Sequence, residues 1–260
     1  PPPTSCFSAA SDVYKRQTLL FVSFGVIADG HLPENYSKYQ SNYLFKCDVP
    51  AKCLNAFSKY MNSPEVKSQN FEADFFAVLH NGWDESTHGI SLYYKDADEY
   101  AKSNSIFATS YAGEMLRKAN INNGLEPISE YLTVHTVGVD DMTPATNTPV
   151  SLRWSLEVQN PLAFVPLWTE FLKSLEKYEW APNAYGLQSH ILGNNGNGIT
   201  HEAWIAVADQ QAALAFLDGM HASPEFAAYV PKAEKVSTFK RSYMQTVSYT
   251  HLRAHETSQH

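Results

Sequence analysis

The chain has 260 residues, of which 44% are hydrophobic and 18% are charged, and its formal net charge is −8. An acidic chain without a basic run is repelled by phosphate backbones, so nucleic acid is not expected as a partner. The sequence has no G-x-S-x-G, P-loop or dinucleotide fingerprint, which leaves hydrolase, kinase and Rossmann functions without support.

The two ends of the chain differ from the rest. Residues 11–17 (SDVYKRQ) and 247–257 (VSYTHLRAHET) resemble translated sequencing adapters, which occur at the edges of metagenomic reading frames. We therefore expect residues 1–17 and 247–260 to be artefacts that make few contacts. The three histidines near the end of the chain are then no metal site.

Residues 18–28 (TLLFVSFGVIA) form an apolar run of signal-peptide length, and a polar leader follows at 29–41. This pattern predicts a signal remnant and export to a bacterial periplasm or beyond, with a buried strand as the alternative. The run is too short to cross a bilayer, and no other segment approaches that length. No membrane span is expected in the mature protein.

Cys47 and Cys53 lie at the end of a predicted strand and in the first turn of a predicted helix. Two alternatives remain for them. In an oxidising compartment they can form a local disulfide. Two buried thiols are favoured instead, because free cysteine is often buried and the sequence does not show whether the side chains face each other.

The sequence between these ends reads as two copies of one unit. The pair Thr87-His88 recurs as Thr200-His201, a shift of 113 residues, and each pair precedes an apolar strand. Residues 45–49 align with 154–158, a shift of 109, and 71–80 align with 183–192. Residues 129–138 align with 238–247. On this alignment Asp48 and Glu157 occupy equivalent places.

Local signals agree with a β-α-β-β-α-β order in each copy. The segments NGWDEST and GNNGNG are turn-rich hairpin loops. Asp96 or Asp98 in the first copy, and Asp209 in the second, stand where a helix N-cap is wanted. We predict a first half at 42–138, a linker at 139–150 and a second half at 151–246. The fold class is α+β, with two ferredoxin-like halves packed sheet to sheet as an intramolecular α+β barrel.

One stretch carries a family resemblance. Residues 201–230 contain a strand with Trp204, then Asp209 before an Ala/Leu-rich helix, then His221 and the turn Ser-Pro-Glu-Phe at 223–226. This stretch resembles the antibiotic-biosynthesis-monooxygenase-like families of the dimeric α+β barrel superfamily. The first half matches them by layout alone.

The resemblance implies several activities. Those families include oxygenases that act without a cofactor and enzymes that degrade haem. Haem-degrading relatives hold iron through a histidine on the helix beyond the turn, and the stretch FAAYVPKAEKV here has none. No cofactor is therefore expected. With the export that the apolar run predicts, the resemblance implies an exported barrel that binds a small aromatic or apolar ligand between its two sheets, and cofactor-independent monooxygenation is one activity that it implies.

Strand alternation predicts a polar face inside the barrel. We expect Arg153, Glu157 and His135 to be the catalytic set, in which the arginine stabilises a developing enolate or phenolate and one of the others takes the proton. The ligand-binding set is expected to be Lys46, Asp48, Tyr243, Gln245 and Trp204. The alternation places Trp154 towards the helices instead.

Two readings compete with catalysis. The polar face can be a seam closed by salt bridges, as in a structural or partner-binding protein, or it can hold a ligand without chemistry. For the charged residues themselves, the favoured interpretation is that salt bridges close the polar face as a seam. Histidines 80, 88, 190 and 201 flank the two hairpin loops but alternate in direction, so no metal site is expected. The protein is expected to be a monomer or a homodimer.

Overall fold

The computed structural model describes residues 37–69, 72–139, 148–193 and 197–251, and these form eight strands and seven helices. In the first half the strands are β1 (Tyr39–Lys46), β2 (Glu72–Leu79), β3 (His88–Tyr94) and β4 (Glu126–Val139). The helices there are α2 (Pro50–Met61), α3 (Pro64–Lys67), α4 (Ala97–Thr109) and α5 (Tyr111–Asn122). In the second half the strands are β5 (Val150–Val158), β6 (Ala184–Leu192), β7 (His201–Val207) and β8 (Ser237–His251), and the helices are α6 (Pro161–Leu175), α7 (Gln210–Ala222) and α8 (Pro224–Ala233).

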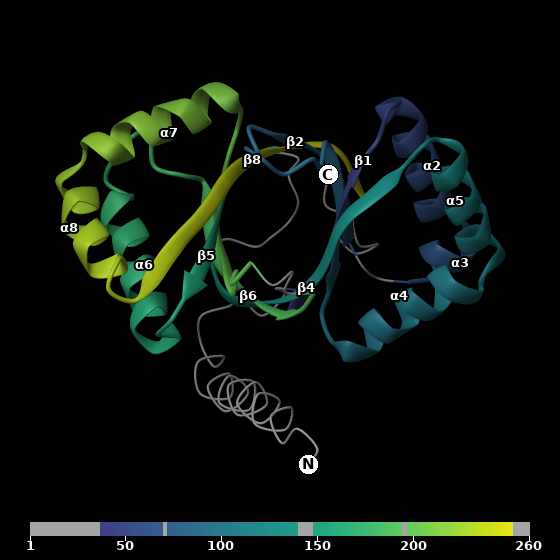
Figure 1. Cartoon of the computed structure of the whole chain (residues 1–260), viewed down its shortest axis with the longest axis horizontal. Helices are drawn as coiled ribbons and strands as arrows, with labels where there is room; N and C mark the ends of the chain where they lie inside the picture. The colour runs from purple at the N-terminus through teal and green to yellow at the C-terminus, as the bar shows by residue number, and fades with distance from the viewer. Residues whose placement is uncertain (1–36, 70–71, 140–147, 194–196, 252–260) are drawn as a thin grey trace, which may run out of the picture.

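The strands close into one barrel in the order β1-β3-β2-β8-β5-β7-β6-β4. Each half contributes a four-stranded ferredoxin-like sheet, and the long strands β4 and β8 each pair with the second strand of the other half. The predicted fold class is therefore confirmed, and the halves are joined edge to edge by hydrogen bonds. Figure 1 shows the barrel in the centre, with α6, α7 and α8 on one side and α2 to α5 on the other.

Helix starts follow the local signals. The side chain of Asp96 accepts from the backbone N–H of Glu99, and that of Asp209 accepts from Ala212, so both caps are confirmed and Asp98 lies inside its helix. Ser110 and Ser223 each end one helix and cap the next, by accepting from Gly113 and Phe226. Each half thus has a second helix before its last strand, which the simple β-α-β-β-α-β pattern did not include.

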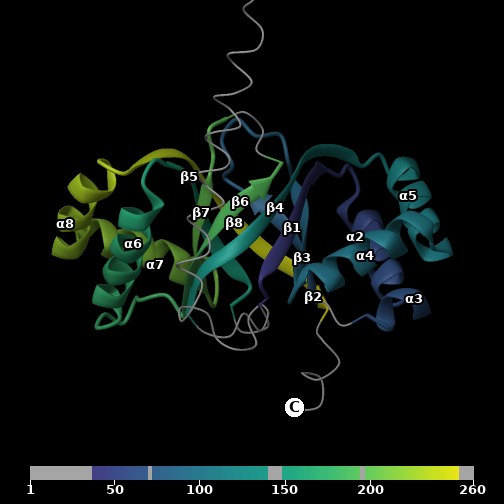
Figure 2. The ribbon, with the colours of Figure 1, turned by 90° about the horizontal axis from the view of Figure 1, so that it is seen from below.

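The side of the barrel wall that faces the helices carries the apolar core. Figure 2, turned by 90°, shows the same three layers of helices, barrel and helices. One cluster joins the second sheet to α6, α7 and α8 and includes Leu152, Trp168 and Phe216. The other joins the first sheet to α2 and α5 and includes Phe57 and Phe75. Among the described residues, no helix is long and apolar enough to cross a bilayer.

The predicted alignment of the first strands was wrong by two residues. The N–H of Thr87 donates to the carbonyl of Phe45, and the N–H of Thr200 donates to that of Leu156. Equivalent bulges follow Leu44 and Ser155. Phe45 therefore corresponds to Leu156, and Lys46, not Asp48, corresponds to Glu157.

Two expected boundaries also move. β1 begins at Tyr39, so 39–41 belong to the barrel and not to a leader. β8 continues to His251, and its residues 247–251 pair with β2. The expectation of few contacts is wrong there: the Tyr249 ring packs edge-on against Phe57, with centroids 6.0 Å apart. Residues 1–36 and 252–260 lie outside the described residues.

The two cysteines form a disulfide between the end of β1 and the first turn of α2. The alternative of two buried thiols is therefore not what the structure contains. The Cys47 and Cys53 side chains are nevertheless buried within the first-half core. The bond ties the strand to the helix that follows it.

Candidate functional site

The centre of the barrel is organised around Glu202, a residue that the sequence did not single out. Its carboxylate accepts hydrogen bonds from the hydroxyls of Tyr131, at 3.3 Å, and Tyr243. The Arg153 Nη1 atom lies 3.6 Å from Glu202 Oε2. Tyr131 pairs with Asn42, and Tyr243 pairs with the corresponding Arg153, so the two tyrosines are equivalent and both halves bind one carboxylate. The predicted alignment of 129–138 with 238–247 was therefore wrong by three residues.

This pair of charges is almost fully removed from solvent. Arg153 is 4% exposed and Glu202 1% exposed. Burial lowers the pKa of Arg153, but the Glu202 carboxylate and the nearby tyrosines Tyr243, Tyr93 and Tyr131 together hold it above its ordinary value. Two buried charges persist together because each compensates the other. The arrangement supports the interpretation that salt bridges close the predicted polar face as a seam.

His135 and Asp74 border the same centre. Burial, and then the charge of Arg153, lower the pKa of His135 to about 3, so its imidazole is neutral at pH 7 and is a weak base. Burial raises the pKa of Asp74 to about 6, although Thr250 and Tyr93 donate hydrogen bonds to its carboxylate. Both groups stand in hydrophobic or hydrogen-bonded surroundings rather than in an open cleft.

The predicted catalytic set is not assembled. Arg153 and His135 are both buried in the interior, as alternation predicted. Glu157 lies four residues further along β5, at the barrel rim, where it pairs with Lys240 at 2.6 Å. Four residues along a strand span about 13 Å, so Glu157 does not reach the central charges.

The predicted ligand-binding residues divide between interior and rim. Tyr243, Gln245 and Trp204 are buried inside the barrel. Trp204 lies across Gly186, where a Cβ atom would come within 2.5 Å of the indole ring. Lys46 pairs with Glu85 at the rim, and Asp48 is exposed outside the barrel beside Gly124. Asp48 was thus wrongly assigned to the interior, because β1 ends at Lys46 and Asp48 lies beyond it.

A cavity of about 370 Å³ lies elsewhere, between the helices and the sheet of the first half. Its walls come from β1, β3, α2, α4 and α5 and from the start of β4. Most of its lining is apolar or aromatic: Tyr43, Phe45, Phe57, Tyr60, Ile90, Leu92, Phe107, Leu116, Leu125, Pro127 and Ile128. We call it the first-half pocket. It has the size and character of a small-molecule site.

One helix residue that lines the pocket is much smaller than its counterpart in the second half. Ser103 is seven residues after the N-cap Asp96, and Phe216 is seven residues after the N-cap Asp209. The Phe216 ring is fully buried against Trp154 and Trp180. Ser103 is buried too and lines the pocket, and the Tyr94 hydroxyl lies 3.4 Å from its Oγ atom.

Other positions show the same contrast. Phe57 on α2 corresponds to the larger Trp168 on α6, and Leu116 on α5 corresponds to Tyr229 on α8. In the second half Tyr229 stacks on Phe171 with centroids 4.3 Å apart. The second half therefore has a packed aromatic core at the place where the first half has a pocket.

The polar groups of the pocket are hydroxyls, amides and one carboxylate. Ser103, Asn104, Asn120, Ser129 and Glu130 contribute to its lining. The Tyr94 hydroxyl donates to Ser103 at 3.4 Å. Burial, and then the charge of Glu130, raise the pKa of Tyr43 to about 12, so this phenol stays protonated. No Lys, Arg or His is among the residues that line this pocket.

Metal and haem chemistry find little support in the donor set. Among the residues that the structure describes, no group of three His, Cys, Asp or Glu side chains could hold a metal ion. The helix α8 carries no histidine, and His221 packs edge-on against Phe226 beside the turn. The residues present thus do not fit the haem ligation of the relatives that degrade haem.

A change of size along a repeat was the signal that could have revealed the pocket. The two halves align by their N-caps, and Ser103 against Phe216 is visible in that alignment. An apolar helix face by itself predicts only a core, as in α6 with its buried Val165, Trp168 and Phe171.

Comparison with known proteins agrees with this architecture. No protein-family model matches the chain, and no curated protein matches it. Among solved structures, the fold is similar to an anthrone oxidase-like protein, with a TM-score of 0.58 and 11% identity over 85% of this chain and 96% of that one. It is also similar to a proposed monooxygenase from Fusobacterium nucleatum, with a TM-score of 0.58 and 12% identity over 84% and 95% of the chains.

A third similar structure is a haem-binding protein from Thermus thermophilus, with a TM-score of 0.50 and 9% identity over 84% of this chain and 95% of that one. At these identities the likeness concerns the fold alone. The chain therefore shares with these structures the fold of an α+β barrel built from two ferredoxin-like sheets.

Proposed function

We propose that this protein binds a small, neutral, aromatic molecule in the first-half pocket. The observation that carries the proposal is the mostly apolar cavity of about 370 Å³, which is lined by Ser103 at the position where the second half has the buried Phe216. Ligand sites are concave and mostly apolar, with a few polar groups that fix orientation. The proposal moves the site from between the two sheets, where the sequence placed it, to the space under the helices.

The lining selects the chemistry of the ligand. Aromatic walls such as Phe57 and Phe107 favour a flat ring. Glu130 and the amides of Asn104 and Asn120 offer partners to a hydroxyl or carbonyl group. A carboxylate or phosphate would meet Glu130 without a compensating cation, so an anionic ligand is disfavoured.

A binding experiment tests the proposal. Isothermal titration calorimetry with phenol, naphthol and anthrone should show saturable binding to the wild-type protein. The variant Ser103→Phe, which copies the second half, should bind at least tenfold more weakly. Ser105→Phe, on the exposed face of the same helix, is the matched control and should bind normally. Equal binding by both variants would refute the pocket as the site.

Cofactor-independent oxygenation of the bound ring is the second candidate. It is supported by the likeness to an anthrone oxidase-like structure, which concerns the fold, and by an apolar pocket that suits such a ring. The pocket has no cation to stabilise a phenolate, which weakens this candidate. Oxygen uptake with anthrone would support it, provided that Ser103→Phe abolishes the uptake. Binding without uptake would leave a ligand-binding protein.

We also propose that the halves arose by duplication and that the protein is exported. The repeated capping residues support the first point, and the Cys47–Cys53 disulfide suits an oxidising compartment. Recovery of the uninterrupted gene tests export and the adapter origin of the ends. A start codon directly before the barrel, without a basic residue and an apolar run, would contradict export.

A further inference from the structure

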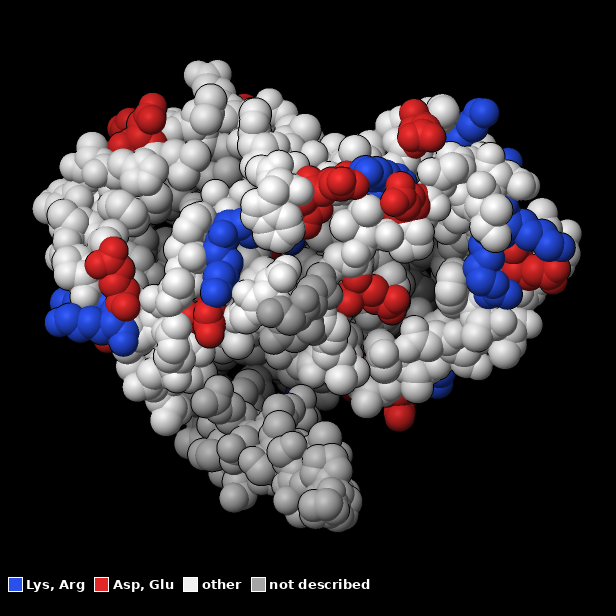
Figure 3. Space-filling view, in the orientation of Figure 1, with Lys and Arg blue, Asp and Glu red and all other residues white. Residues whose placement is uncertain are grey.

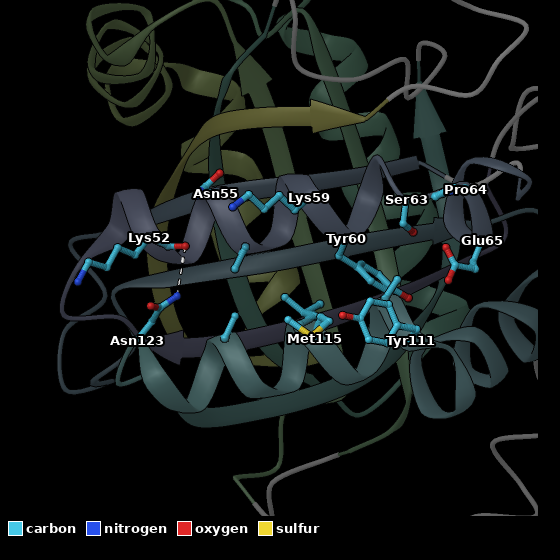
Figure 4. A pocket seen from close by; sticks show the side chains of 14 residues that line it. Lys52, Asn55, Lys59, Tyr60, Ser63, Pro64, Glu65, Tyr111, Met115 and Asn123 are labelled. Atoms are coloured by element: carbon cyan, nitrogen blue, oxygen red, sulfur yellow. Dashed lines mark hydrogen bonds between the residues drawn. The ribbon is translucent and has the colours of Figure 1, made fainter.

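A second cavity adjoins the first-half pocket from outside. This groove, of about 510 Å³, runs between α2 and α5. Figure 4 shows Tyr60, Tyr111 and Met115 between the two helices, with Lys52 and Asn123 at one end and Glu65 at the other. Tyr60 and Leu116 line both the groove and the pocket. These two side chains are therefore the partition between them.

The partition is weak in comparison with its counterpart. Tyr60 is ten residues after Pro50, the first residue of α2, and Phe171 is ten residues after Pro161, the first residue of α6. Leu116 corresponds to Tyr229 in the same way. In the second half two stacked rings therefore occupy the positions of this partition, whereas the first half has one ring and one aliphatic side chain there.

The groove differs from the pocket in the shape that it accepts. Three alanines, Ala56, Ala112 and Ala119, line it together with Met115. Small side chains on two facing helices leave a narrow channel, and methionine adapts to an aliphatic chain. At the position of Ala56 the second half has Leu167. The pocket, by contrast, is lined by aromatic rings and hydrogen-bonding groups.

We infer that the pocket and the groove form one elongated site for an aromatic molecule that bears a long aliphatic tail. This inference rests on the proposed function, since the ring occupies the first-half pocket. The tail passes between Tyr60 and Leu116 and lies along the alanines and Met115. A compact polycyclic ligand would leave the groove empty.

A series of 4-alkylphenols, from ethyl to octyl and below their aggregation concentrations, tests the inference by calorimetry. In the wild-type protein each methylene that enters the groove should raise affinity by roughly two- to fourfold, up to the octyl compound. In Leu116→Tyr, which copies the second half, the gain should stop at the tail length that fills the pocket.

A second variant keeps the test valid if Leu116→Tyr does not fold. Ala56→Leu narrows the groove from the other helix and should flatten the same series, with circular dichroism and the thermal midpoint as folding checks. Ethylphenol should still bind with an affinity within a few fold of wild type to Ala56→Leu, because Ala56 lines the groove and not the pocket. A wild-type gain that stops at short tails would overturn the inference while leaving the pocket intact. An unchanged slope in both folded variants would overturn it too. Failure of ethylphenol to bind the wild-type protein would refute the proposed function itself.

Discussion

The two halves of the barrel share one element order but differ in what lies between their helices and their sheets. In the second half Trp154, Trp168 and Phe216 fill that space. In the first half the corresponding residues are Tyr43, Phe57 and Ser103, and a pocket remains. The same backbone plan can therefore serve as a packed core or as a binding site, depending on the volume of a few side chains.

The halves also differ at the barrel centre. Glu202 on β7 corresponds to Gly89 on β3, where a Cβ atom would come within 2.5 Å of the Phe76 ring. One carboxylate and one arginine thus serve both halves. A symmetric pair of identical halves would place two carboxylates, or none, at this point. The asymmetry has the largest expected effect on stability.

We expect Glu202→Ala to lower the free energy of unfolding by about 3–5 kcal/mol, because Arg153 is left buried without its counter-charge. Urea denaturation measures this loss. Glu157→Ala removes a partly exposed pair with Lys240 and should cost about 1 kcal/mol or less. Equal losses in the two variants would show that the central pair is not a buried seam.

Giving each half the residue of the other half at the position of Ser103 and Phe216 should change the free energy of unfolding in opposite ways. Phe216→Ser should cost about 3 kcal/mol or more, since a fully buried ring leaves a cavity. Ser103→Phe should be neutral or should add up to about 1 kcal/mol, since the ring enters existing space. Chemical denaturation of both variants measures the difference. A large loss in Ser103→Phe would mean that the pocket cannot accept a ring.

The disulfide is another difference between the halves. Val158 and Phe164 stand in the second half where Cys47 and Cys53 stand in the first. Reduction should lower the free energy of unfolding by about 2 kcal/mol, as expected for a short closed loop. Denaturation with and without dithiothreitol measures this, and the Cys47→Val, Cys53→Val double variant should be insensitive to the reductant. No effect on the wild-type protein would remove the bond as a stabilising feature.

The smallest expected effect is a pH dependence at Asp74. Its pKa is raised to about 6 by burial, so the folded state holds the proton more tightly than the unfolded chain. The protonated Asp74 side chain therefore contributes its full stabilisation below the pKa that Asp has in the unfolded chain. This contribution is lost as the pH rises through about 6.

Between pH 5 and pH 7 the loss should be about 1 kcal/mol. His190, whose pKa burial lowers to about 4, gives the opposite slope, so the wild-type curve alone does not isolate Asp74. The difference in the free energy of unfolding between wild type and Asp74→Asn isolates the contribution of Asp74. If that difference is constant over this range, Asp74 does not titrate there.

The sequence by itself determined the plan of the molecule. Helix caps such as Asp96 and Asp209, hairpin loops and strand alternation depend on neighbours in the chain, so they were predictable from it. The same local rules placed Arg153, His135 and Tyr243 inside the barrel. They also identified two ferredoxin-like halves and hence the fold class.

Only the tertiary structure decided how distant residues meet. Strand bulges and unequal loops displaced the alignment by two residues in the first strands and by three in the last strands. Asp48 lies outside the interior because β1 ends before it. The bond between Cys47 and Cys53 depends on the angle at which α2 leaves β1. Glu202 became the centre because strands of both halves bring their tyrosines to it. The pocket is a volume that no side chain fills. Its size depends on the side chains of all the packed layers together, so it cannot be derived from one segment of the sequence.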